Sequence, residues 1–192
     1  MILDIVLQNR SYRRFLENKR LSYSELSELI SIARFTPSAA NLQNIRYFLI
    51  DSVPDCEAIF PHLKWASYLQ YWNGPEQGER PVAYILVLAP TNTTKFHHID
   101  TGIAAQTILL AAVDKGFGGC MLASIDKVAV HELFSLPSNL DIVLAIALGY
   151  PAEKVEIEDV TDPDDVEYWR DEDDCHHVPK RRLKDLIINR KG

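Results

Sequence analysis

Three arginines, Arg10, Arg13 and Arg14, crowd the stretch NRSYRRF at residues 9–15 of a chain whose formal net charge is −7. A guanidinium group stays charged at any working pH, and its planar fork of donors matches a phosphate. If the backbone is near-helical, Arg10 and Arg13 lie three positions apart and reach the same anion. Charge-assisted hydrogen bonds of this kind contribute roughly 1.5–3 kcal/mol each. The spacing therefore predicts an anion site; the alternative is a solvated basic face that pairs with the protein's own acids.

The stretch TPSAANLQ, residues 36–43, is the second one that could contact a ligand. It combines hydroxyl and amide side chains with small residues. Small side chains let a flat molecule approach the backbone, and amides donate to or accept from the rim of a polar heterocycle. The alternative interpretation of residues 36–43 is a plain turn at the end of a helix, without a ligand.

Hydrophobic periodicity and turn residues predict the elements that position these two stretches. Ser22 and Glu25 have the spacing of a capping box, and the apolar stripe behind them predicts a helix that ends before Pro37. The run at 99–115 is apolar on nearly every side, so we expect a buried central helix that stops at Gly116. Further elements are expected as helices over 2–9 and after Asp126, strands over 47–51, 83–89, 119–124 and 142–149, a helical turn or two and then a long loop over 52–80, and an apolar turn over 183–187.

Length and composition narrow the class of protein. A chain of 192 residues favours one domain, 1–192, in which about 152–192 form a charged C-terminal extension. The acidic balance, with a pI near 5.3, argues against nucleic acid or an anionic membrane as a main partner. The longest apolar run is too short to span a bilayer, and the N-terminus lacks the layout of a secretory signal. Three widely spaced cysteines fit a reducing cytoplasm.

Several familiar site motifs do not occur: G-x-G-x-x-G, G-x-x-x-x-G-K-[ST], G-x-S-x-G and H-E-x-x-H. The clusters most like metal ligands are His97-His98 and Cys175-His176-His177. Adjacent histidines on a strand point to opposite faces, and a zinc site needs four ligands. We therefore expect no metal site. Cys175 is not expected to act as a nucleophile, because the acids around it raise a thiol pKa.

The order R-S-x-R-x-F, amphipathic helix, P-S-A-x-N-x-Q resembles the nitroreductase family of FMN-dependent flavoproteins. Later segments agree with the family in the same order: residues 100–106, which open the apolar helix, then 116–124, 148–151 and 178–181. The resemblance covers nearly the whole chain. It implies a mixed α+β fold in which helices flank a mostly antiparallel central sheet, and a homodimer that exchanges its C-terminal arm.

The resemblance also implies what the arginines meet, namely the 5′-phosphate of FMN. The family's first motif maps onto Arg10 and Arg13, which would hold the phosphate and the ribityl chain, with Ser11 nearby. An arginine ahead of the last apolar turn also meets the phosphate in that family. Arg181 fits this position best, with Arg182 as its rival.

Two further segments would contact the flavin ring if the resemblance holds. The P-S-A-x-N-x-Q stretch would line it from the other subunit, and backbone near residues 122–124 would face the isoalloxazine. The residues concerned are Pro37, Ser38, Ala39, Asn41 and Gln43 in the first segment and Leu122, Ala123 and Ser124 in the second. The sequence departs from the family where Asn44 and Ile45 replace the usual Pro-Trp, and where Ala123 and Ser124 replace common glycines.

The resemblance implies an oxidoreductase in which NADH or NADPH delivers a hydride to flavin N5 and then leaves. A small electron-poor acceptor, such as a nitroaromatic or a quinone, would follow it in the same site in a ping-pong cycle. Because the flavin carries the chemistry, no catalytic side chain is expected. Two alternatives remain open. One is a reductive dehalogenase-like or flavin-fragmenting enzyme of the same fold, and the other is a flavin-binding carrier or sensor without turnover.

The C-terminal extension is unusually acidic, with eight acids and one arginine from Asp162 to Asp174. That charge density predicts a surface position, so we expect an extended arm. Tyr168 and Trp169 in its middle suggest that the arm docks. The resemblance implies that it embraces the second subunit and carries Arg181 to a phosphate there, and a frayed tail is the alternative.

Overall fold

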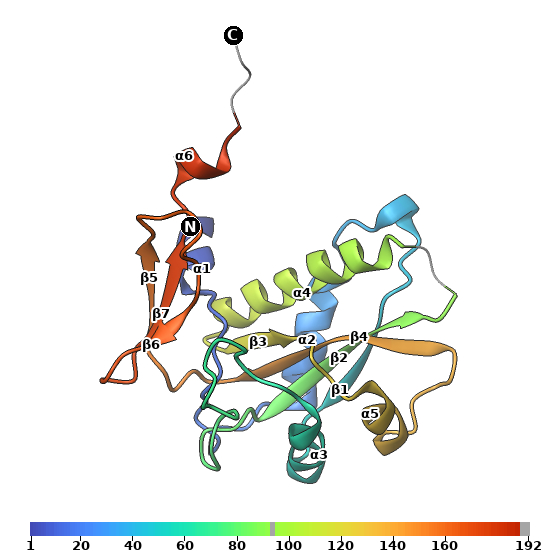
Figure 1. Cartoon of the computed structure of the whole chain (residues 1–192). Coiled ribbons are helices and arrows are strands. Elements are labelled where there is room, and N and C mark those ends of the chain that lie inside the picture. Colours follow the sequence, from blue (N-terminus) through green and yellow to red (C-terminus); the bar gives the residue numbers. More distant parts are fainter. Residues whose placement is uncertain (93–94, 189–192) are drawn as a thin grey trace. The chain divides into compact units, whose positions relative to one another are not determined.

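The computed structural model describes residues 1–92 and 95–188, and they form two compact units (Figure 1). Unit 1 contains Met1–Trp65 and Gly74–Ala152. Unit 2 combines the short segment Ala66–Asn73 with the chain from Glu153 onward. The boundary at Glu153 falls next to the start of the charged extension expected near residue 152, whereas no sequence pattern indicates that residues 66–73 fold with that extension.

Unit 1 is built on a sheet with the strand order β1-β2-β4-β3, in which all three pairs are antiparallel. The strands are β1 (Arg46–Ile50), β2 (Ala83–Pro90), β3 (Gly118–Leu122) and β4 (Leu140–Gly149). Every residue of β2 except Pro90 is buried, because β2 is a central strand with helices on both faces. The predicted strands and the mostly antiparallel sheet are confirmed.

Helices cover both faces of this sheet (Figure 1). They are α1 (Ile2–Gln8), α2 (Tyr23–Ala33), α3 (Val53–Ile59), α4 (His97–Asp114) and α5 (Lys127–Leu133), with short 3-10 turns η1 (Ala39–Asn41) and η2 (Phe60–His62). The long helix α4 packs Ala105, Ile108 and Ala112 into the same core as Ile85 of β2 and Ile146 of β4. Within the described ranges, no helix has both the length and the apolar character needed to cross a bilayer.

Local signals fix the ends of these helices where the sequence predicted them. The Ser22 hydroxyl accepts from the N–H of Glu25 at 3.3 Å, and the Glu25 carboxylate accepts from the N–H of Ser22 at 2.7 Å. Asp126 caps α5 by accepting from the N–H of Ala129 at 3.1 Å. Gly116, after α4, has a φ of 81°, in the left-handed region where glycine ends a helix at little cost.

Unit 2 differs from the extended arm expected from the sequence. Its strands β5 (Val155–Asp159) and β7 (His176–Lys180) pair in parallel, and the two-residue β6 (Trp169–Arg170) pairs antiparallel with β7. A one-turn helix, α6 (Leu183–Leu186), follows. Aromatic and ionic contacts hold this acidic segment together in place of a large aliphatic core.

Residues 66–73 supply part of that support within unit 2. The ring of Tyr168 packs edge-on against Tyr68 with 4.9 Å between centroids. The Arg170 guanidinium lies 4.8 Å from the ring centroid of Trp72 and pairs with the buried Glu153 carboxylate at 3.2 Å. Tyr168 thus packs inside unit 2 against a segment distant in sequence, and the expected docking of the arm on a second subunit stays a prediction.

Candidate functional site

The arginine segment, residues 9–15, lies along the beginning of β3. Ser11 forms a parallel bridge with Gly119, and the N–H of Tyr12 donates to the carbonyl of Gly119 at 3.0 Å. Gly118 permits this close approach, because a Cβ at that position would lie 2.5 Å from Cδ2 of Tyr12. The segment is therefore fixed against the sheet edge on the N-terminal side of Leu122.

Arg10 and Arg13 are less exposed than most arginines. Arg13 is buried, with 8% of its surface accessible, and its Nη1 donates to the Ser11 carbonyl at 3.2 Å. Arg10 is half-buried, and its Nη2 donates to the Val6 carbonyl at 2.7 Å. Burial lowers the pKa of the Arg10 guanidinium from its ordinary value, and the charge of Tyr12 partly opposes this. The Arg13 side chain is thus shielded from bulk water, and that of Arg10 is partly shielded.

The Nε atom of Arg10 is the feature that fits an anion best. It is buried and has no hydrogen-bond partner among the described residues. A buried donor left unpaired costs roughly 1–3 kcal/mol, which a bound phosphate oxygen would recover. Arg14, which the resemblance leaves outside the site, instead forms an ion pair with Glu79 (Nε–Oε2 3.1 Å).

The loop over residues 37–43 is held in a specific shape beside the beginning of α4. The N–H of Ala39 donates to Oδ1 of the buried Asp100 at 3.0 Å, and the N–H of Gln43 donates to the Ser38 hydroxyl at 2.8 Å. Left-handed φ angles occur at Ala40 (50°), Asn41 (54°) and Gln43 (49°). Such angles cost non-glycine residues of order 1–3 kcal/mol each and gather at functional sites. The loop is therefore a candidate ligand contact on geometric grounds.

A cavity of about 160 Å³ lies beside this loop. Residues of the loop, of β1 and of α4 line it, among them Pro37, Ser38, Gln43, Tyr47 and Asp100. Pockets that enclose a whole small ligand usually measure about 300–1,000 Å³. This cavity is therefore only a part of any flavin-sized site.

The third predicted segment, residues 122–124, directly follows β3. Leu122 is buried, whereas Ala123 and Ser124 are exposed. The Ser124 carbonyl accepts from the N–H of Lys64 at 3.0 Å, which anchors the chain after the strand. Ala123 is thus the first exposed residue beyond the strand that the arginine segment adjoins.

Two groups of predicted site residues in unit 1, the loop over 37–43 and the arginine segment, lie toward opposite ends of α4 (Figure 1). The loop over 37–43 contacts Asp100 near the first turn of the helix. The arginine segment adjoins Gly119, where an added Cβ would lie 2.7 Å from Cδ2 of Leu109. Asp100 and Leu109 are nine residues apart, or roughly 14 Å along a helix axis. One chain does not bring the two groups together.

Arg181 and Arg182 belong to unit 2, where backbone carbonyls hold both. Nε of Arg181 donates to Pro163 at 2.6 Å, and Nε of Arg182 donates to Val160 at 2.9 Å. Arg181 also reaches the carboxylate of Asp164 at 3.4 Å, a largely exposed and therefore weak ion pair. Arg181 is thus the easier of the two to redirect to a phosphate.

The model of the nitroreductase family matches residues 6–150. The chain belongs to the nitroreductase family. A Methanothermobacter thermautotrophicus protein with the provisional name NADH dehydrogenase/NAD(P)H nitroreductase is 27% identical over 177 residues, which are 88% of this chain and 87% of that protein. The iodotyrosine deiodinase of Thermotoga neapolitana is 24% identical over 168 residues, covering 79% and 89% of the two chains.

Solved structures agree with this assignment at the level of the fold. The FMN-dependent nitroreductase of Clostridium difficile R20291 superposes with a TM-score of 0.66 at 18% identity and covers 79% of this chain and 88% of that one. The predicted family and the mixed fold with its antiparallel sheet are confirmed. The exchange of the C-terminal arm stays a prediction, as do the roles of the individual site residues.

Two contributors to the site escaped the sequence analysis. Asp100 was noticed only as part of a family segment, and its hydrogen bond to Ala39 joins residues 61 positions apart. Lys64, which anchors Ser124, lies in the region 52–80, where a helical turn or two and a long loop are expected, and no sequence pattern marks it. The position of Asp100 is the sequence feature that could have indicated its role. An acid in the first turn of a helix is well placed to accept a hydrogen bond from the backbone N–H of another segment.

Proposed function

We propose that this member of the nitroreductase family is an FMN-dependent oxidoreductase that uses NADH or NADPH as hydride donor. The names of its relatives support the donor and the cofactor. The observation in this chain that carries the proposal is the buried, unpaired Nε of Arg10 beside the buried Arg13, at the positions that match the family's first motif. The guanidinium groups of Arg10 and Arg13 would suit a phosphate group.

Arg10 and Arg13 would bind the FMN phosphate, with the Ser11 hydroxyl close to it. The loop over 37–43 would line the flavin through its small side chains and through the amides of Asn41 and Gln43. The backbone of residues 122–124 would face the ring. FMN, when bound, supplies the redox chemistry, and these residues supply binding, orientation and shielding from water.

Because the two groups of site residues lie at opposite ends of α4, we place the complete site between two copies of the chain. The loop over 37–43 of one subunit would then meet the arginine segment of the other. Exposed apolar residues fit a subunit interface: Ile99 on α4 and Ile2, Leu3 and Leu7 on α1 are all largely accessible in one chain. The C-terminal arm would complete the site by bringing Arg181 to the partner's phosphate.

The acceptor would be a small electron-poor molecule, either a nitroaromatic or a quinone. Reductive dehalogenation is a second candidate, because the iodotyrosine deiodinase of Thermotoga neapolitana is a relative over most of its length. The three free, buried cysteines suit the reducing cytoplasm in which we expect the protein to act.

The test is to purify the protein, load it with FMN and mix it with NADH or NADPH without oxygen. Bleaching of the flavin absorbance, followed by its return on adding a quinone or nitroaromatic, is the expected result. Turnover of a halogenated tyrosine with neither of these acceptors active would favour the dehalogenase. A protein that does not bind added FMN would overturn both candidates.

A further inference from the structure

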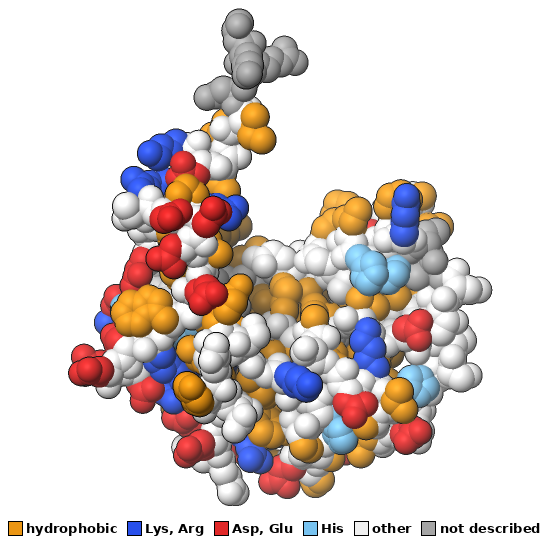
Figure 2. Space-filling model, viewed as in Figure 1, with side chains coloured by type: hydrophobic (Ala, Val, Ile, Leu, Met, Phe, Trp, Pro, Cys, Tyr) orange, Lys and Arg blue, Asp and Glu red, His pale blue; other side chains and the backbone are white. Residues whose placement is uncertain are grey.

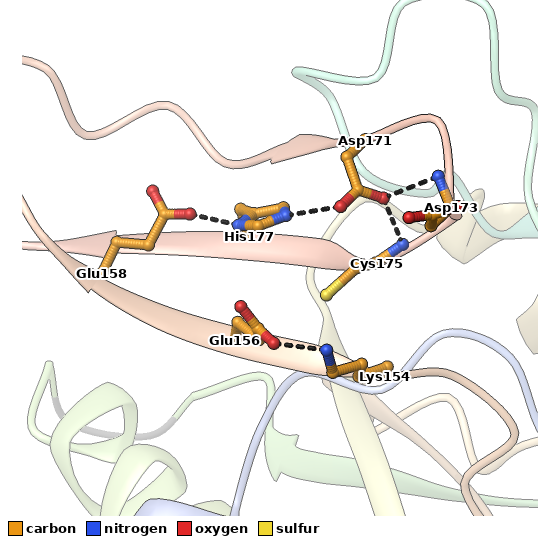
Figure 3. A network of polar contacts seen from close by, with 7 residues as sticks. All are labelled: Lys154, Glu156, Glu158, Asp171, Asp173, Cys175 and His177. Carbon is orange, nitrogen blue, oxygen red and sulfur yellow. Dashed lines mark hydrogen bonds and ion pairs between the residues drawn. The ribbon is translucent and has the colours of Figure 1, made fainter.

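Side chains with metal-ligating atoms share one face of the three-stranded sheet in unit 2 (Figure 3). Strands β5 and β7 are parallel, and their register places Glu156 opposite His177. Residues two apart on a strand share a face, so Glu158 joins Glu156, and Cys175, directly before β7, joins His177. One ligand atom from each of Glu156, Cys175 and His177 lies within 4.8 Å of the other two.

The expectation of no metal site relied on neighbours in sequence alone. Its argument about adjacent histidines is sound, because His176 is buried against the Tyr168 ring while His177 stacks on Trp169. What the sequence could not supply was Glu156, which lies 19 positions before Cys175 and meets it only through the parallel pairing of the strands.

Asp171 orients the two residues contributed by β7 and its preceding turn. Its Oδ2 contacts Nε2 of His177 at 3.0 Å, and its Oδ1 accepts from the N–H groups of Cys175 at 2.8 Å and Asp173 at 3.0 Å (Figure 3). A carboxylate that holds one imidazole nitrogen leaves the other nitrogen free to bind a metal in a fixed ring orientation. In His177 the other nitrogen, Nδ1, contacts the carboxylate of Glu158, so an ion bound there would replace that contact.

The donor set selects the class of ion. A thiol sulfur, an imidazole nitrogen and carboxylate oxygens are the ligands of zinc, whereas calcium and magnesium take oxygen ligands alone. Zinc–ligand bonds of about 2.0–2.3 Å put tetrahedral ligands roughly 3.3–3.6 Å apart. Ligand atoms within 4.8 Å therefore need to move by about 1 Å, which side-chain rotation provides.

Charge also favours a cation on this face. Glu156, Glu158 and Asp171 face it, and acidic side chains gather over unit 2 (Figure 2). The ammonium of Lys154 pairs with Glu156, but the two side chains are 72% and 46% exposed, so breaking this ion pair costs little free energy. The Cys175 side chain is buried, and a bound cation would pair with its thiolate.

We propose that Glu156, Cys175 and His177 bind one zinc ion, with Glu158 as the fourth ligand, and that the ion ties β5 to β7. Asp171 is a positioning residue that acts through His177. The site lies beyond residues 6–150, which match the family model, and does not depend on the proposed flavin chemistry. Its role is structural, because zinc that joins two strands stabilises the folded form of a unit with little aliphatic core.

The experiment uses the full-length protein without a histidine tag, stripped of metal with a chelator and then titrated with Zn²⁺ or Co²⁺. We expect one ion per chain, and for Co²⁺ a thiolate charge-transfer band together with the visible bands of tetrahedral cobalt. Cys175→Ser should abolish the charge-transfer band, and His177→Gln should weaken binding strongly. Asp171→Asn should keep the band and lower the affinity roughly 10- to 100-fold.

Cys56→Ser is the matched control, since Cys56 is a buried cysteine of unit 1 and should leave metal binding unchanged. Circular dichroism of each variant separates lost ligands from lost folding. Wild-type protein without a cobalt–thiolate band would overturn the site regardless of how the variants fold. So would a folded Cys175→Ser protein that keeps the band, or a folded Cys56→Ser protein that loses it.

Discussion

The backbone N–H of Ala39 donates a 3.0 Å hydrogen bond to Oδ1 of Asp100, a buried carboxylate in the first turn of α4. This bond joins the loop over residues 37–43 to the helix at whose far end the arginine segment lies. The shape of the loop, with its left-handed residues, thus depends on one side chain that does not itself need to touch the ligand.

Replacing Asp100 with Ala should therefore weaken FMN binding. A hydrogen bond to a charged group contributes about 1.5–3 kcal/mol, so we expect roughly a 10- to 100-fold rise in the FMN Kd if the loop loses its shape entirely. Fluorescence titration of FMN measures the effect. The control is Asp114→Ala, an exposed acid at the other end of α4, which should bind like the wild type. Equal Kd values for the two variants would contradict a role for the loop.

Arg10→Ala and Arg13→Ala should each weaken FMN retention by about 1.5–3 kcal/mol, because each removes charge-assisted hydrogen bonds to the phosphate. Riboflavin, which lacks the phosphate, should bind the wild type and both variants equally weakly. Arg14→Ala is the matched control, since Arg14 pairs with Glu79 within the chain. If the double variant of Arg10 and Arg13 holds FMN as tightly as the wild type, the phosphate assignment is wrong.

Sequence reasoning succeeded where the signal was local. The capping box of Ser22 and Glu25, the cap at Asp126 and the stop at Gly116 each act within a few residues of the element they end, so the pattern alone located the helices. The arginine motif was also readable because its residues are contiguous.

Prediction from the sequence failed where the structure depends on pairing between segments that are distant in the chain. Strands β5 and β7 pair in parallel, and the paired residues Val155 and His176 are 21 positions apart in the sequence. The acidic residues of this region make its alternation of apolar and polar residues hard to recognise. Residues 66–73 join unit 2 through contacts such as Tyr68 with Tyr168, one hundred positions apart. The left-handed backbone at Ala40 was equally unreadable, because alanine carries no preference for that conformation.

Ile99→Glu should dissociate the proposed homodimer and release FMN with it. Ile99 is 59% exposed on α4 in one chain, and burying an unpaired carboxylate at an interface costs several kcal/mol. Light scattering across a dilution series, read beside flavin absorbance, measures both losses. Val128→Glu is the control, because Val128 is an apolar residue of α5 that is 70% exposed. A dimer that survives Ile99→Glu with its flavin would place the interface elsewhere.

The capping box of α2 should make stability depend on pH through Glu25. Hydrogen bonds from the backbone N–H and then the hydroxyl of Ser22 lower the pKa of Glu25 below its ordinary 4.5. A lowered folded-state pKa means that the contribution is complete above the ordinary pKa and is lost as pH falls through the lowered one. At neutral pH, Glu25→Gln should cost about 0.3–1 kcal/mol of unfolding free energy.

Urea unfolding at several pH values tests this. The difference between wild type and Glu25→Gln should shrink toward zero in acid, whereas Glu57→Gln, an exposed acid on α3, should show little difference at any pH. A Glu25→Gln deficit that stays constant into acid would mean that the carboxylate charge does not stabilise α2.

Arg181→Ala should lower FMN affinity, whereas Arg182→Ala should lower it less. Arg181 is held by the Pro163 carbonyl and by the exposed carboxylate of Asp164, so redirecting its guanidinium to a phosphate breaks weak contacts. Arg182 donates to two backbone carbonyls, Val160 at 2.9 Å and Thr161 at 2.8 Å, and would leave both unpaired. FMN titration of the two variants at equal dimer content is the measurement.

Mixed dimers test whether the arm crosses to the partner. A dimer is assembled from one Arg181→Ala subunit and one Arg10→Ala subunit. If the arm crosses, both substitutions fall in the same FMN site, and the second FMN site of the dimer stays intact. Two weakened sites in that mixed dimer, with neither binding FMN like the wild type, would instead mean that each arm stays with its own chain.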